Sequence, residues 1–414
     1  MIKIQKYSEV EPDFFQGRNF SESIEVVDSV LEEVQKKGDA ALRIYGQKFD
    51  VSVPAAFEVP QEELKAAAEK LKIEKRDIYD AIVYSHDLAL KFAKLQRKSF
   101  TDFEEELEPG IITGQKTIAV ERAGCYVPAG RFPLVSTVIM TVTPAVAAGV
   151  KEVIMCTPPR VHPDDKDAAG RNAAGIPGKA YVGGKPYADE GIMAAAYICG
   201  VNHLYAVGGS QAIGAMAYGT ESIPKVDVIV GPGNKFVASA KKEVYGTVGI
   251  DMIAGPTEVL VIADESANPA WVAADLLAQA EHDVVAQPVL VTTSESLAKK
   301  VSQEIEKQLE TLPTKETARQ SIDNYGKIII VESLEQAAEA ANRKAPEHLE
   351  LALNDAGIPK AARNMVVSEN GKPSLSGNYC VYYNLSHSGG KVMCVLTMQP
   401  CGCDVQKVKQ DSDE

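Results

Sequence analysis

Two ionisable side chains stand next to each other in the segment Ala345-Pro346-Glu347-His348-Leu349-Glu350. An imidazole titrates near neutral pH, so His348 is suited to moving protons under physiological conditions. The adjacent Glu347 carboxylate would handle a second proton or activate a water molecule. A Glu-His pair is also common at an exposed helix start, and the segment taken alone is compatible with both interpretations.

A second candidate site lies in the segment Gln279-Ala280-Glu281-His282-Asp283. On a helix, Gln279 and His282 are three residues apart and face the same way, whereas Glu281 points elsewhere. Zinc commonly binds imidazole and carboxylate groups, so the spacing favours His282 with Glu281 or Asp283 over Gln279. A single helical histidine also suits a surface or core position without a metal.

Two glycine-rich turns each separate an expected strand from an expected helix. They are Val207-Gly208-Gly209-Ser210-Gln211 and Val230-Gly231-Pro232-Gly233-Asn234-Lys235. Glycine lets the backbone approach a ligand closely, and the start of the following helix offers free N–H groups to a phosphate. Asn234 would cap its helix or bind a ligand amide. Neither turn has the G-x-G-x-x-G pattern, so a purely structural turn remains the alternative.

The elements that position these segments follow from the hydrophobic pattern. Amphipathic spacing indicates helices within residues 21–47 and 60–95, and after Thr117 short β-branched runs alternate with alanine-rich segments. The expected strands are 151–156, 203–207, 226–230, 258–263, 288–293 and 327–331. The expected helices are 136–148, 191–199, 211–218, 234–245, 270–280 and 296–309.

Apolar strands that alternate with helices predict an α/β fold with parallel sheets covered on both faces. The alternation occurs twice, before and after about residue 251, which favours two Rossmann-like halves. Ligands of such sheets collect beyond the carboxyl ends of the strands. We therefore expect all four candidate segments at carboxyl edges.

Composition excludes several classes of function. The chain has 43 Lys and Arg against 57 Asp and Glu, a net charge of −14, which argues against a nucleic-acid reader or a protein that coats anionic lipid. Seven scattered cysteines in 414 residues do not form a disulfide framework, and the N-terminus has no apolar signal region, so a cytoplasmic location is expected. Glycines interrupt the uncharged stretch 191–220, which argues against a membrane span.

Taken together and in order, six segments resemble the signature of the histidinol dehydrogenase family over about residues 20–355. They are Cys125-Tyr126-Val127-Pro128-Ala129-Gly130, Gly208-Gly209-Ser210-Gln211-Ala212-Ile213, Gly231-Pro232-Gly233-Asn234, Ile253-Ala254-Gly255-Pro256-Thr257-Glu258-Val259, Gln279-Ala280-Glu281-His282 and Pro346-Glu347-His348-Leu349. The resemblance implies a zinc-dependent homodimer that uses two NAD to oxidise L-histidinol through the aldehyde to L-histidine, the last step of histidine biosynthesis.

The resemblance also implies two incomplete Rossmann-like domains, with Tyr126, Gln211 and Asn234 in contact with NAD. The implied division has a helical N-terminal region and an atypical tail. Its parts are an arm over 1–22, a first domain over 23–123 plus 252–355 with the metal and catalytic residues, a second, NAD-binding domain over 124–251, and an irregular tail over 356–414.

The family pattern assigns zinc to Gln279 and His282, against the carboxylates that spacing alone favours. Thr257 stands where the family usually has serine, and its hydroxyl would bind substrate together with Gln279, His282 and His348. His348 would take the alcohol proton as hydride leaves for NAD, and Glu347 would activate water on the aldehyde. Zinc has no redox chemistry and would hold the amino alcohol in place.

The resemblance ends near Asp355. The family continues with a Gly-Asp-Tyr segment that supplies an aspartate ligand, a Pro-Asn-His run, and a tail that completes the partner subunit's site, and residues 356–414 show none of these. A shifted reading frame would explain the difference and would leave zinc with two ligands. The other reading of the tail is a replacement metal site, although the spacing matches no familiar zinc module. Its residues would be Cys380, His387, Cys394, Cys401 and Cys403.

Two further functions stay open at this point. One is a relative that oxidises another small polar alcohol, such as a sulfonated diol. The other is a catalytically impaired nucleotide-binding protein, because the altered tail would remove part of the site.

Overall fold

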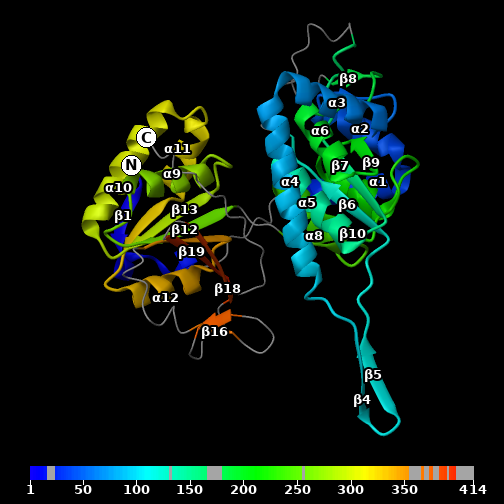
Figure 1. The fold of residues 1–414 in the computed structure, drawn as a ribbon. Coiled ribbons are helices and arrows are strands. Elements are labelled where there is room, and N and C mark those ends of the chain that lie inside the picture. Colours follow the sequence, from blue (N-terminus) through cyan, green and yellow to red (C-terminus); the bar gives the residue numbers. More distant parts are fainter. Residues whose placement is uncertain are drawn as a thin grey trace. The chain divides into compact units, whose positions relative to one another are not determined.

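The computed structural model describes residues 1–15, 24–129, 133–165, 180–253 and 257–353, together with the backbone of four short strands between residues 365 and 397. The chain divides into two compact units. Unit 1 contains residues 1–19 and 256–414, and unit 2 contains residues 20–255. Each unit has its own parallel sheet and its own hydrophobic core (Figure 1).

Unit 2 is built on a six-stranded sheet in the order β11-β10-β6-β7-β9-β3. Its parallel strands are β6 (Arg122–Tyr126), β7 (Glu152–Thr157), β9 (His203–Ala206), β10 (Val228–Val230) and β11 (Gly249–Ile250), and β3 (Glu58–Val59) joins the edge in the antiparallel sense. Counted along the chain, the parallel strands take the order 3-2-1-4-5, which is the Rossmann order. The predicted fold class is confirmed for this half.

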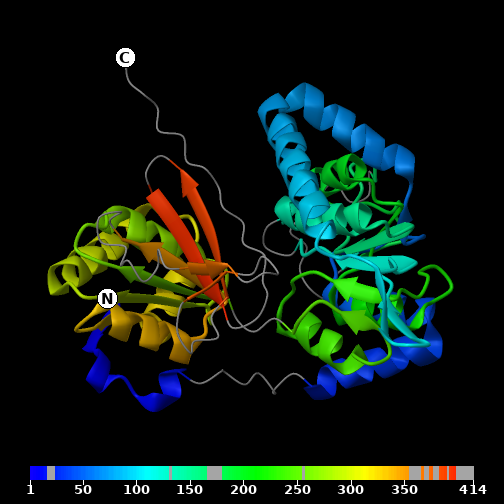
Figure 2. The same cartoon turned by 60° about the horizontal axis from the view of Figure 1, so that its bottom comes forward.

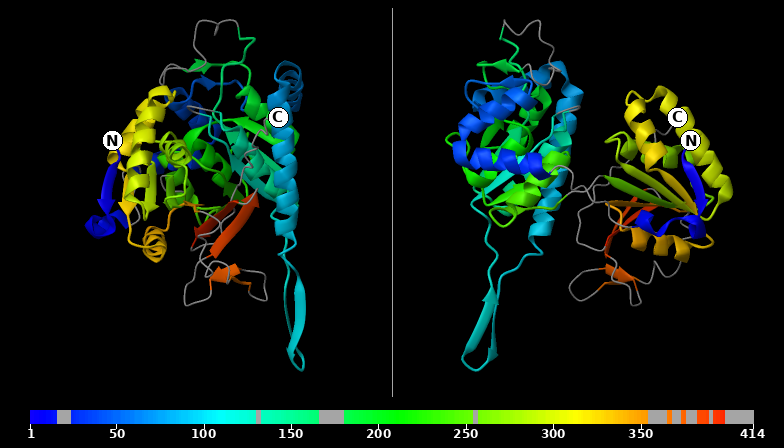
Figure 3. Two further views of the ribbon diagram at one scale, coloured as in Figure 1. Left: turned by 60° about the vertical axis from the view of Figure 1, so that its left-hand side comes forward. Right: turned by 180° about the vertical axis from the view of Figure 1, so that it is seen from behind.

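Helices cover both faces of this sheet. One face carries α1 (Ile24–Lys37), α2 (Asp39–Phe49), α7 (Gly209–Tyr218) and α8 (Lys235–Val244), and the other carries α3 (Gln61–Glu74), α4 (Arg76–Arg97), α5 (Val135–Ala148) and α6 (Glu190–Cys199). The short strands β2 (Ser52–Val53) and β8 (Tyr181–Val182) pair beside them. A hairpin of β4 (Phe103–Glu108) and β5 (Ile111–Gln115) projects from the unit (Figure 3).

The predicted domain that joined residues 23–123 to 252–355 is wrong. Val27, Leu31 and Val34 of α1 are buried in one core with α7 and α8, and Leu64 and Leu71 of α3 are buried in another with α6. These apolar faces attach the N-terminal helices to the sheet of unit 2. The chain accordingly changes units at residues 255 and 256.

Unit 1 contains a five-stranded, fully parallel sheet in the order β1-β14-β13-β12-β15. The strands are β1 (Lys3–Lys6), β12 (Glu258–Ala263), β13 (Gln287–Thr292), β14 (Lys327–Ile330) and β15 (His348–Ala352). Four of them take the order 3-2-1-4, and β1 pairs with β14 at one end. The N-terminal segment is thus a sheet strand, not the expected arm over residues 1–22.

Helices α9 (Pro269–Ala280), α10 (Glu295–Thr311) and α11 (Lys315–Asn324) pack on one face of this sheet. The other face carries α12 (Leu334–Lys344) and two short 3-10 turns, η1 (Tyr7–Glu9) and η2 (Pro12–Phe15), near the N-terminus (Figure 2). All six expected strands and all six expected helices of the two halves are present, with ends shifted by at most two residues.

The tail is not irregular throughout. Strands β16 (Met365–Val367) and β17 (Pro373–Leu375) form one antiparallel pair, and β18 (Tyr382–Ser388) and β19 (Lys391–Thr397) form another (Figure 2). Of the residues considered for a replacement metal site, His387 and Cys394 lie on these strands, while Cys380, Cys401 and Cys403 lie outside the described residues. In the described part of the chain, no helix combines the length and the apolar character needed to cross a membrane.

Candidate active site

The predicted proton-transfer residues lie at the amino-terminal edge of the sheet in unit 1. The register sets His348, the first residue of β15, beside Val259 of β12. Thr257 directly precedes β12, and its carbonyl oxygen accepts a hydrogen bond of 3.0 Å from the N–H of Gln287 on β13. Thr257 and His348 therefore belong to the same edge of neighbouring strands.

This placement corrects two expectations. His348 starts a strand and not a helix, and its segment lies at the amino edge where a carboxyl edge was expected. The reason is connectivity, because the chain enters β12 and β15 at this edge. Glu347 and His348 are both exposed, and His348 Nε2 lies 3.8 Å from Glu347 Oε1.

The turn before this pair has an unusual backbone. Helix α12 ends at Lys344, and Ala345 follows with φ of 48°, a left-handed conformation that non-glycine residues rarely adopt. Lys344 is buried and its ammonium group lies 2.8 Å from the Glu258 carboxylate. The Glu258 N–H donates to Glu347 Oε2 at 3.4 Å. These contacts fix the segment that carries the proton-transfer pair, and no sequence pattern indicated them.

The segment around Gln279 reaches the same edge from α9. Gln279 lies in the last turn of α9 and is buried, and the exposed His282 follows the helix end with its N–H donating to the Gln279 carbonyl at 3.2 Å. Because α9 leads into the amino end of β13, both residues lie on the side of the sheet where Thr257 lies. Glu281 accepts a hydrogen bond of 2.6 Å from Thr314 Oγ1, so its carboxylate is directed toward the start of α11.

The fit of these residues to zinc is partial. Gln279 and His282 are two possible donors, and the buried Nε2 of Gln279 has no hydrogen-bond partner among the described residues. Zinc in proteins usually takes four ligands. Within the described ranges, no group of three or more His, Cys, Asp or Glu side chains is arranged to hold a metal. The described residues alone do not complete a zinc site.

A further carboxyl group lies on the same strand as His348. Glu350 lies two residues along the same strand, and burial, reinforced by Asp275 of α9, raises its pKa to about 7. Residues two apart on a strand share one face, so Glu350 and His348 both face α9. This carboxyl is able to hold a proton near neutral pH, a property that follows from its tertiary surroundings and not from its sequence.

In unit 2, two predicted NAD contacts lie at the carboxyl edge of the sheet, as expected. Tyr126 is the last residue of β6, and the turn that contains Gly231 and Asn234 follows the neighbouring strand β10. These strands flank the point where the strand order reverses, which is where such sheets bind ligands. Gly231 has φ of 124°, and a Cβ atom there would overlap the Tyr126 carbonyl, so this turn requires glycine.

Gln211 lies in the first turn of α7, close to Tyr126. The Tyr126 hydroxyl accepts a hydrogen bond of 3.0 Å from the Gly209 N–H, and Gln211 Nε2 donates to Asp50 Oδ2 at 3.2 Å. The Gly208 N–H also donates to Asp50. The expectation of free N–H groups for a phosphate is therefore wrong for Gly208 and Gly209, whose N–H groups have partners within the protein.

Asn234 caps α8, as one of its two interpretations predicts. Its side-chain oxygen accepts hydrogen bonds from the N–H groups of Phe236 at 3.1 Å and Val237 at 3.2 Å, which leaves its NH2 group directed away from the helix backbone. The turn before it is anchored by a buried lysine. Lys241 Nζ donates to the Gly231 carbonyl at 2.9 Å and contacts Asp251, which accepts from the Gly231 N–H at 2.8 Å.

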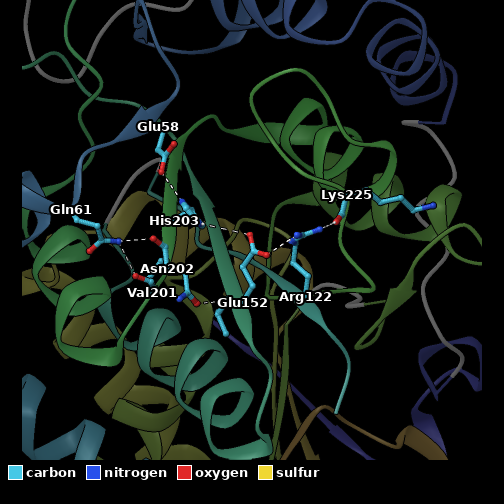
Figure 4. Close-up of polar contacts among 9 residues, drawn as sticks. Glu58, Gln61, Arg122, Glu152, Val201, Asn202, His203 and Lys225 are labelled. Carbon is cyan, nitrogen blue, oxygen red and sulfur yellow. Dashed lines mark hydrogen bonds and ion pairs between the residues drawn. The ribbon is translucent and has the colours of Figure 1, made fainter. Parts of the chain in front are cut away.

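The amino-terminal ends of the parallel strands in this sheet carry a polar network (Figure 4). His203 Nδ1 lies 2.7 Å from Glu58 Oε1, and an Arg122 nitrogen lies 2.6 Å from Glu152 Oε2. Arg122 also donates to the Lys225 carbonyl at 2.8 Å. Arg122, Glu152 and His203 begin β6, β7 and β9, and Glu58 lies on β3, so the network joins four strands at the end away from Tyr126.

Comparisons with known proteins agree with this geometry. The family model for histidinol dehydrogenase matches residues 16–185 and 179–384. The histidinol dehydrogenase of Streptococcus mutans is 46% identical over 330 residues, which are 80% of this chain and 70% of that protein. The enzyme of Aquifex aeolicus is 46% identical over 331 residues, with the same coverage.

Solved structures give the same result. The crystal structure of histidinol dehydrogenase from Elizabethkingia anophelis is 32% identical, covers 89% of this chain and 78% of its own, and superposes with a TM-score of 0.73. The family match extends past residue 355 to residue 384. The chain belongs to the histidinol dehydrogenase family of oxidoreductases.

Proposed function

We propose that the protein oxidises L-histidinol through the aldehyde to L-histidine, with NAD as hydride acceptor. The observation that carries this proposal is the meeting of three separate family segments at one sheet edge of unit 1. Thr257, Gln279 to His282, and Glu347 to His348 are distant in sequence, and the connectivity of β12, β13 and β15 gathers them.

The dinucleotide would bind to unit 2. Tyr126 and Asn234 stand at the switch point of a Rossmann-ordered sheet, and Gln211 is linked to Tyr126 through the Gly208-Gly209 turn. The exposed Asn234 NH2 group is what this edge offers to a ligand acceptor, and the buried Tyr126 holds the Gly208-Gly209 turn beside it. This arrangement supports NAD as the cofactor.

The chemistry assigned to the pair divides two proton transfers between two bases. His348 accepts the hydroxyl proton of the alcohol while hydride leaves the same carbon for NAD, which gives the aldehyde and NADH. Glu347 accepts a proton from water as that water adds to the aldehyde. The resulting anion of the hydrate then gives a second hydride to a second NAD and becomes the carboxylic acid, which loses its proton to solvent. Both side chains are exposed and thus accessible to substrate.

Zinc belongs to this proposal as a positioning ion. Gln279 and His282 would hold it, and when bound it would orient the amino alcohol. A homodimer and a cytoplasmic location are parts of the same proposal. Metal analysis of the purified protein tests the zinc assignment directly, and Gln279→Ala with His282→Ala should remove the bound metal.

The deciding experiment compares substrates. Purified protein with zinc and NAD should form NADH from L-histidinol at least tenfold faster than from a sulfonated diol of similar size. A preference for the sulfonated diol would favour the first rival function. NAD binding without NADH formation from any alcohol would favour the impaired nucleotide-binding protein.

A further inference from the structure

Asp50 is a half-buried carboxyl group that the proposed chemistry does not use. It directly follows α2, and its side chain reaches the start of α7, where it contacts a residue 161 positions away in sequence. Asp50 Oδ2 accepts a hydrogen bond of 3.2 Å from Gln211 Nε2, and the carboxylate also accepts from the Gly208 N–H. The carboxylate thus occupies the positive end of the α7 dipole.

The turn around Asp50 is built for this contact. A Cβ atom on Gly208 would lie 2.8 Å from Asp50 Oδ1, so glycine makes room for the carboxylate. At the next residue, the Gly209 N–H donates to the Tyr126 hydroxyl at 3.0 Å. Asp50 and Tyr126 therefore hold consecutive backbone N–H groups of one turn, and Gln211 follows that turn.

The hydrogen bond from Gln211 to Asp50 fixes the orientation of the Gln211 amide group. An amide side chain has an NH2 end that donates and an oxygen end that accepts. Asp50 holds the NH2 end, and the oxygen end lies over Gly209, where a Cβ atom would be only 2.7 Å from Oε1. Gln211 is 1% exposed, and its Oε1 has no hydrogen-bond partner among the described residues.

A buried acceptor without a hydrogen-bond partner is unfavourable, so it marks a place where a donor is missing. We propose that Asp50 is a positioning residue of the cofactor site, which orients Gln211 so that its carbonyl oxygen, not its NH2 group, accepts a hydrogen bond from the bound dinucleotide. This inference rests on the proposed function, because NAD is the ligand. The matching group on the cofactor is a hydroxyl or an N–H, and a phosphate oxygen is excluded because it only accepts.

The test exchanges the carboxylate and the amide between positions 50 and 211. In Asp50→Asn, the new amide can donate to Gln211 Oε1 and turn the side chain round, so the Kd for NAD should rise about tenfold. In the double variant Asp50→Asn with Gln211→Glu, the introduced amide donates to the introduced carboxylate, which again leaves an oxygen for the ligand. The net charge of the pair is unchanged, and the Kd should return to within about threefold of the original value.

Asp39→Asn is the matched control, since Asp39 begins the same helix that Asp50 follows. Asp39 accepts from the Ser222 N–H at 3.3 Å, beyond the opposite end of α7 from Gln211, so this variant should lower stability and leave the Kd for NAD unchanged. Calorimetric titration of the full chain with NAD gives all four constants, and thermal unfolding shows that each variant is folded.

The outcomes distinguish a failure of the proposed function from a failure of the inference about Asp50 alone. An original chain that binds no NAD overturns the proposed function and this inference with it. An original chain that binds NAD, with the Asp50→Asn variant binding equally well, overturns the inference alone. The inference also fails if the double variant binds no better than Asp50→Asn.

Discussion

The ammonium group of Lys344 lies 2.8 Å from each carboxylate oxygen of Glu258, and the lysine side chain is only 2% exposed. This ion pair joins the last residue of α12 to the first residue of β12. Since the Glu258 N–H also donates to Glu347, the pair holds the left-handed turn at Ala345 against the sheet. The position of His348 thus depends on a contact that lies outside the exposed edge itself.

Removing Lys344 should destabilise unit 1. Lys344→Met removes the buried ammonium group from the half-buried Glu258 carboxylate, which should lower the free energy of unfolding by about 3 kcal/mol. Chemical denaturation measures the loss. The control is Lys307→Met, which removes an exposed pair with Glu304 on α10 and should cost less than about 0.5 kcal/mol. Equal losses in the two variants would show that the buried pair does not stabilise the fold.

Ala345→Gly should stabilise the protein slightly. The left-handed backbone costs an alanine roughly 1–2 kcal/mol, and glycine avoids this cost while losing more entropy on folding. We expect a net gain of about 0.5 kcal/mol in the free energy of unfolding. Ala338→Gly, in the middle of α12, should instead lose about 1 kcal/mol. A loss of similar size at Ala345 would contradict the left-handed assignment.

Asp50 should make stability depend on pH. Burial raises its pKa from 3.8 to about 7, so between these values the folded state binds more protons than the unfolded state. The free energy of unfolding therefore falls as pH rises from about 4 to 7 and is level above that range. Asp50→Asn removes this contribution, so its stability relative to the original chain should rise with pH by on the order of 3 kcal/mol.

Urea denaturation from about pH 4.5 to about pH 8.5, a window that spans the titration, measures this difference. Asp39→Asn, which changes the carboxyl at the other end of α2, serves as the reference. A stability difference between Asp50→Asn and the original chain that is independent of pH would show that the Asp50 carboxyl titrates normally.

His348→Asn should lower kcat by about 10²–10⁴, because it removes the base that accepts the alcohol proton. The Kd for NAD should stay the same, since Tyr126, Gln211 and Asn234 belong to the other unit. Steady-state kinetics and calorimetry together measure both effects. Glu335→Gln, an exposed change on α12, should leave kcat unaltered. A His348→Asn variant with the original kcat would remove His348 from the mechanism.

The sequence predicted elements well where the local pattern was strong. The runs at 258–263 and 288–293 consist almost entirely of apolar or β-branched residues, and they are strands β12 and β13. Strand β6 was missed because Arg122–Tyr126 contains no β-branched residue, and β15 was missed because a Glu-His pair after a proline resembles a helix start.

A local sequence pattern does not specify which other element a helix or strand packs against. The apolar face of α1 shows that the helix packs, but only the folded chain shows that Val27 and Leu31 pack against α7 of unit 2. The same holds for the site. Family motifs pointed to Gln211 and Glu347, whereas Asp50 and Lys344 contact the site segments from positions 161 and 86 residues away.

The most direct test of the central claim is the stoichiometry of NADH formation from L-histidinol by the purified, zinc-loaded protein. Complete conversion should give two NADH for each L-histidinol and L-histidine as product, and His348→Asn should slow the reaction by about 10²–10⁴. No NADH from L-histidinol, or a single NADH with the aldehyde as final product, would contradict the assignment of both proton transfers to Glu347 and His348.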